Sequence, residues 1–119
     1  MKLVTAEHER RLLANGRWNA ARTAQGEIPA DFRPVVKLFC PWGAATWLLT
    51  ELDPENHDCA FGLCDLGMGY PEIGRVRLSE IAAVKGPGGL RIERDLHFRA
   101  GKTLQAYADE AQRYGRIVA

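Results

Sequence analysis

The sequence lacks the marks of several large protein classes. No apolar run approaches the roughly 18–20 residues that a membrane-spanning helix needs, because the longest uncharged stretch, 38–50, is too short and contains a proline and a glycine. Serine occurs once, as Ser79, and no nucleophile-elbow pattern surrounds it. The three cysteines form an odd set without a secretory signal, which argues against a disulfide framework. We therefore expect a cytoplasmic chain with reduced thiols, no cofactor and no membrane contact.

Charge is nearly balanced overall but is unevenly distributed. The formal net charge is +1, so the chain as a whole is not a polycation. Between residues 35 and 74 a single basic residue, Lys37, stands against six acidic ones, whereas the segments before and after carry a basic excess. A surface that carries both signs steers charged partners. This pattern leaves a protein partner and a nucleic-acid partner both open, and it does not decide the oligomeric state.

Length and turn spacing predict one α+β domain over residues 1–119, since single domains mostly run about 100–150 residues. Thr5 is expected to cap a first helix, and Asn15-Gly16 leaves open whether that segment is one helix or two. Four segments with strand-like composition are separated by short turns and predict an antiparallel meander, at 35–40, 45–52, 59–66 and 73–78.

The C-terminal third predicts two further helices and one further strand. Ser79 is the expected N-cap of a short helix over 80–84, and Thr103 is the expected N-cap of the last helix, which Gly115 closes. Four apolar residues of that last helix share one face, namely Leu104, Tyr107, Ala108 and Ala111. A fifth strand is expected within 91–98. The predicted architecture is thus a four- to five-stranded meander covered by the first and last helices.

Four carboxylates form the candidate acidic cluster. They lie at or next to the ends of the predicted strands, and a meander is expected to bring them together at one end of the sheet: Glu51, Asp53, Asp65 and Glu72. Clustered carboxylates with magnesium serve metal-dependent nucleases. The usual companion motifs are missing, however, and turn aspartates are common for structural reasons. The same acidic segment is also a candidate surface for a basic protein partner.

A set of arginines forms the candidate nucleic-acid-binding surface. Arg75 and Arg77 alternate with Val76 and Leu78, so they are expected to point away from the core together. Further members follow in the C-terminal third, with Phe98 nearby as an aromatic: Arg91, Arg94 and Arg99. Arginines interleaved with aromatics bind phosphate backbones and bases. A solvated, charged strand edge is the competing interpretation.

Two motif-like features point to no site. Gly101-Lys102-Thr103 is similar to the end of a phosphate-binding P-loop, but the position that needs the first glycine holds Leu96. The histidines and cysteines, among them Cys59 and Cys64, match no usual zinc-ligand spacing, and two residues five apart on one strand face opposite sides. We therefore expect neither a nucleoside triphosphate nor a zinc ion.

Several long strings resemble the domain of unknown function 2958 family. They cover nearly the whole chain and include 34–39, 45–54, 60–67, 71–74, 93–98 and 115–118. The resemblance implies a bacterial protein of plasmids, phages or integrated elements, and some similar proteins are labelled single-stranded DNA endonucleases. The resemblance assigns no catalytic residue to this chain. The resulting expectation is a non-enzymatic accessory protein of a mobile element that binds protein or nucleic acid, for instance an inhibitor of host defence. The alternative is a metal-dependent single-stranded DNA endonuclease.

Overall fold

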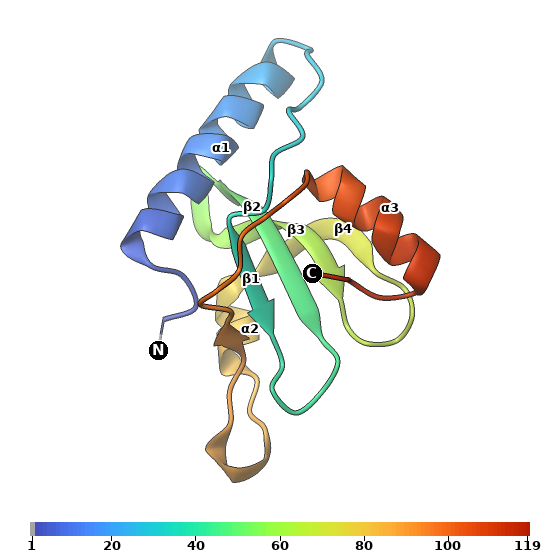
Figure 1. Cartoon of the computed structure of the whole chain (residues 1–119). Coiled ribbons are helices and arrows are strands. Elements are labelled where there is room, and N and C mark those ends of the chain that lie inside the picture. The colour runs from blue at the N-terminus through green and yellow to red at the C-terminus, as the bar shows by residue number, and fades with distance from the viewer. Residues whose placement is uncertain (1) are drawn as a thin grey trace.

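The computed structural model describes residues 2–119 and has an α+β architecture (Figure 1). Its elements, in chain order, are α1 (Ala6–Ala24), β1 (Val36–Phe39), β2 (Thr46–Asp53), β3 (Asn56–Asp65), β4 (Glu72–Arg77), α2 (Leu78–Ala83), a 3₁₀ turn η1 (Pro87–Gly89), β5 (Glu93–Arg94) and α3 (Leu104–Tyr114). The five strands form one sheet in the order β4-β3-β2-β1-β5, and all pairs are antiparallel. The predicted meander of the first four strands is therefore confirmed.

Both faces of the sheet are covered, because adjacent residues of a strand point to opposite faces. On one face, α1 and α2 pack against side chains such as Leu49, and Leu12 of α1 is fully buried there. On the other face, α3 packs against Leu48 and Leu63. This two-sided burial explains why β2 is buried continuously from Trp47 to Thr50 rather than alternating. The first and last helices thus lie on opposite sides of the sheet (Figure 1).

α1 is one continuous helix, which settles the question that Asn15-Gly16 left open. Thr5 caps it as predicted, since Thr5 Oγ1 accepts from the His8 backbone at 3.0 Å. Gly16 remains helical because it lies against the backbone of β2: a Cβ atom there would come within 1.8 Å of the Leu52 carbonyl oxygen. Asn15 donates from Nδ2 to the Thr50 carbonyl at 3.0 Å. Tertiary contact with β2 therefore outweighs the local tendency of Asn-Gly to end a helix.

Two expectations for the C-terminal third need correction. α2 begins at Leu78 with Arg77 in the N-cap position, and Ser79 instead donates from its hydroxyl to Asp58 Oδ2 at 2.6 Å. The strand expected within 91–98 is reduced to Glu93–Arg94, because Asp95 Oδ1 accepts from the His97 backbone and turns the chain away from the sheet. The prediction for α3 is confirmed, with the Thr103 cap, the buried stripe and Gly115 at φ 70°.

Candidate functional site

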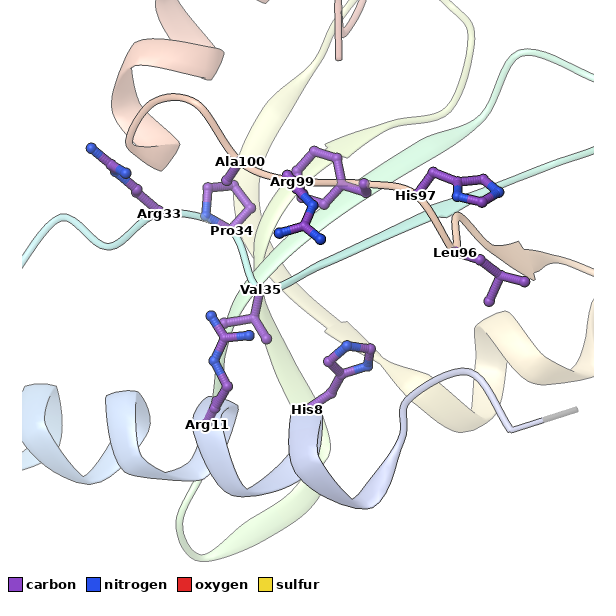
Figure 2. Close-up of a pocket in the computed structure, with 10 residues that line it drawn as sticks. His8, Arg11, Arg33, Pro34, Val35, Leu96, His97, Arg99 and Ala100 are labelled. Atoms are coloured by element: carbon purple, nitrogen blue, oxygen red, sulfur yellow. The ribbon is translucent and has the colours of Figure 1, made fainter.

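A pocket of about 640 Å³ lies between the N-terminal half of α1, the segment 33–35 and the segment 96–100 (Figure 2). We call it the basic pocket, because its lining contains no aspartate or glutamate and its titratable members are all basic: His8, Arg11, Arg33, His97 and Arg99. Figure 2 shows His8 and Arg11 rising from α1 toward Val35, and Arg99 reaching into the same space from the other side. Arg33 and His97 extend outward at its margins.

Each wall of the basic pocket is held by contacts elsewhere in the fold. Leu12 and Leu13 anchor α1 on the sheet, which leaves His8 and Arg11, three residues apart, on the flank of the helix. Pro34 and Val35 form a buried floor. The segment 96–100 is fixed at one end where the Asp95 backbone donates to the Lys37 carbonyl at 2.9 Å, and beyond its other end where the Leu104 backbone donates to Phe32.

The basic pocket carries positive charge that the protein itself does not neutralise. Across the described residues, no salt bridge includes Arg11, Arg33 or Arg99. The neighbouring carboxylate of Asp95 is already paired with Lys37, at 3.5 Å. Uncompensated guanidinium groups at a concave surface attract anions, and they bind phosphate and carboxylate oxygens with charge-assisted hydrogen bonds.

The pKa of His8 reflects its surroundings in the pocket. Its pKa is lowered from the usual 6.5, first by burial and then by the positive charges of Arg94 and Arg11, against a smaller opposing effect of the Glu7 carboxylate. Its Nδ1 atom accepts from the Thr5 backbone at 3.3 Å, so the neutral ring carries its proton on Nε2. A neutral His8 can therefore donate one hydrogen bond from Nε2, and a bound anion would favour its protonated form.

A family model described as "Protein of unknown function (DUF2958)" matches residues 3–118. The chain belongs to the DUF2958 family. No curated protein and no solved structure matches it. No helix in the described part of this DUF2958 chain is both long and apolar enough to cross a membrane.

The predicted arginine set is dispersed over the fold, and of its five members only Arg99 lines the basic pocket. Arg94 lies on β5, close enough to His8 to lower its pKa, and donates from Nη1 to the Lys2 carbonyl at 2.7 Å. Arg75 and Arg77 lie on β4, the opposite edge strand, and both are exposed. Arg91 donates to the carbonyl of Ala82 at 3.2 Å. Because β4 and β5 are opposite edges of the sheet, Arg94 does not share one surface with Arg75 and Arg77 in this DUF2958 chain.

Most of the basic pocket was missed by sequence reasoning. His8, Arg11 and Arg33 precede the predicted strands, and nothing in their spacing relates them to Arg99. What unites them is the pairing of β5 with β1, which returns the chain from residue 94 to the side of α1. The available signal was the basic excess of the N-terminal and C-terminal segments, because residues of both segments line the pocket.

The register of the sheet separates the four candidate carboxylates into two pairs. Asp65 lies opposite Thr46 at the start of β2, and Glu72 lies opposite Cys64, whereas Glu51 and Asp53 lie at the far end of β2. Five residues of strand correspond to roughly 16 Å. Among the described residues, no three His, Cys, Asp or Glu side chains come together as a group that could hold a metal ion.

Asp65, which lies with Glu72 at one end of the sheet, has a structural role. Its side chain is 2% exposed, so it contributes to no acidic surface. Its Oδ1 atom accepts from the Gly67 backbone at 2.8 Å, and its Oδ2 atom accepts from the Ile117 backbone at 3.0 Å. These two bonds shape the turn after β3 and fasten the C-terminal segment to the sheet.

Proposed function

We propose that the chain is a non-enzymatic accessory protein of a bacterial mobile element that binds single-stranded nucleic acid through the basic pocket. The observation that carries this proposal is the basic pocket itself: Arg11 and Arg99 reach into it from opposite sides, Arg33 lies at its margin, and no carboxylate lines it. Phosphate groups supply the negative charge that such a pocket lacks, and this sequence-independent attraction provides much of the affinity of nucleic-acid-binding proteins.

The remaining lining of the pocket favours a nucleic acid over a small inorganic anion. Phe98 lines the pocket and is partly buried beside Tyr107, and His97 lies at the margin of the pocket. Single-strand binders combine a positive groove with such rings, on which bases stack. A pocket of about 640 Å³ also has room for a nucleotide rather than for a phosphate alone. A flexible single strand can bend into a recess between three segments, whereas a rigid duplex presents its phosphates on a convex surface.

The alternative of a metal-dependent nuclease has less support. Such an enzyme needs carboxylates that converge on the metal and the scissile phosphate. Here Asp65 is committed to backbone amides, and Glu51 lies at the other end of β2. The proposal therefore assigns binding, without cleavage, to the basic pocket.

Fluorescence anisotropy with labelled single-stranded DNA and RNA, over a series of salt concentrations, tests the proposal. The double substitution Arg11→Gln/Arg99→Gln is expected to weaken binding about equally for all sequences. It should also lower the slope of log K against log salt by about 1.4 if each arginine contacts one phosphate. Arg17→Gln/Arg113→Gln removes the same charge from exposed residues outside the pocket and is expected to change little.

Two results would overturn the proposal. One is the absence of binding at low salt, where electrostatic affinity is greatest. The other is an equal loss of affinity in the two double variants, which would show that net charge rather than the basic pocket determines binding.

A further inference from the structure

A second pocket, of about 550 Å³, lies between the C-terminal half of α1 and the end of the sheet where β2, β3 and β4 meet. Three of its residues form a row across these strands: Glu51 is the register partner of Phe61, and Phe61 is the register partner of Arg75. We call this site the Glu51 pocket. Small residues of α1, such as Gly16 and Ala20, line the same pocket, and the Phe61 ring packs in part against the cluster of Leu48 and Leu63.

Glu51 is held in place by a buried asparagine. Asn19 is 5% exposed and donates from Nδ2 to Glu51 Oε2 at 2.9 Å. The asparagine is itself fixed by Ala30, whose backbone N–H donates to its Oδ1 at 2.7 Å and whose carbonyl accepts from its Nδ2 at 3.1 Å. Burial raises the pKa of Glu51, against smaller opposing effects of Asn19 and Arg75. Its carboxylate is therefore rigid, partly desolvated and poorly compensated.

Arg75 provides the opposite chemistry, and its guanidinium lies over the Phe61 ring. Its Cζ atom lies 5.6 Å from the centroid of the Phe61 ring, and its side chain is exposed. Across residues 2–119, no salt bridge joins Arg75 to Glu51. The row thus presents a group that only accepts hydrogen bonds, an aromatic ring, and a group that only donates them.

We propose that the Glu51 pocket binds a guanine base of the single strand, with Glu51 accepting from the base and Arg75 donating to it. Guanine places two adjacent donors, N1–H and the N2 amino group, opposite one carboxylate, which allows a bidentate interaction. Its O6 and N7 atoms are acceptors that arginine binds. The part of the Phe61 ring that lines the pocket, beside the Arg75 guanidinium that lies over the ring, supplies an apolar contact for the base.

The other bases match this row less well. Adenine and cytosine each offer one amino group to the carboxylate. Thymine and uracil offer a single N–H between two carbonyl oxygens, which a carboxylate repels. The rim of the pocket selects the base over the phosphate backbone. Asp53 and Glu55 line the same pocket, and their negative charges repel a phosphate there. The two pockets therefore divide the strand between them, with phosphate at the basic pocket and base at the Glu51 pocket.

This inference rests on the proposed binding of single strands, and its test uses oligo(dT) strands that carry isolated guanine, inosine, adenine or cytosine. The intact protein is expected to bind the guanine strand at least about 10-fold more tightly than plain oligo(dT). The inosine strand should lose much of that gain, because inosine lacks the N2 amino group. Glu51→Gln should abolish the guanine preference, because the amide replaces one acceptor by a donor. It should not weaken binding to oligo(dT), because it removes a negative charge that repels the carbonyl oxygens of thymine.

Glu55→Gln is the matched control, since it removes the same charge from the rim of the pocket and should retain the guanine preference. Arg75→Gln, an exposed position, provides a second variant that should reduce the preference without affecting folding. Equal affinity for all strands, a preference for another base, or a guanine preference that survives Glu51→Gln overturns the inference. If the strands bind equally and Arg11→Gln/Arg99→Gln weakens them all, the proposed function stands and only the guanine inference falls. If no strand binds, the proposed function fails as well.

Discussion

Replacing Gly16 by alanine tests how closely α1 must approach the sheet. In an exposed helix interior this change would stabilise the helix by about 1 kcal/mol, because glycine is the poorer helix former. Here the added Cβ atom would lie 1.8 Å from the Leu52 carbonyl oxygen, so helix and strand must separate by more than about 1 Å. That shift loosens the packing of Leu12 and Leu13. Overpacking of this kind costs typically about 1–3 kcal/mol and occasionally more.

We expect Gly16→Ala to lower the free energy of unfolding by about 2 kcal/mol, a large fraction of the 5–15 kcal/mol that is typical of a domain. Urea unfolding followed by circular dichroism measures the change, and an unaltered m-value shows that it reflects stability. Gly101→Ala is the matched control, because nothing lies within 4 Å of its Cβ position, and it should be neutral or slightly stabilising. If Gly16→Ala is as stable as the intact protein, the close approach of α1 to β2 does not require glycine at this position.

Two further predictions concern one buried and one half-buried carboxylate, Asp65 and Glu51. Asp65→Ala leaves the Gly67 and Ile117 amides without their acceptor and should lower the free energy of unfolding by about 1–3 kcal/mol. Amide hydrogen exchange at Ile117 should become faster. Unchanged exchange at Ile117 would contradict the role of Asp65 in fastening the C-terminal segment. Burial raises the pKa of Glu51 above its usual 4.5, so the folded state binds this proton more tightly than the unfolded state. The contribution of Glu51 to stability therefore falls as the pH rises from the pKa of the unfolded state through the raised pKa of the folded state. Glu51→Gln should therefore gain stability relative to the intact protein between pH 4 and pH 7, whereas a constant difference over this range would refute the effect of burial.

Local patterns in the sequence were sufficient for much of the fold. The first four strands pair in chain order because the turns between them are too short for a parallel crossover. Thr103 and Gly115 bound α3, because a side-chain cap and a left-handed glycine act within one turn of the helix. The Ser79 cap failed for a complementary reason: Asp58, 21 residues away in sequence, binds that side chain instead.

The sites depended on contacts between distant segments. Sequence alone determined that Arg11, Arg33 and Arg99 exist and that they carry charge, but the pairing of β5 with β1 decided that they line one pocket. The row of Glu51, Phe61 and Arg75 likewise follows from an irregularity in the pairing of β2 with β3 between Leu49 and Glu51. Such shifts change which side chains share a face, because the side-chain period of a strand is two. Local propensity therefore determined the elements, and only tertiary register and packing decided which side chains meet.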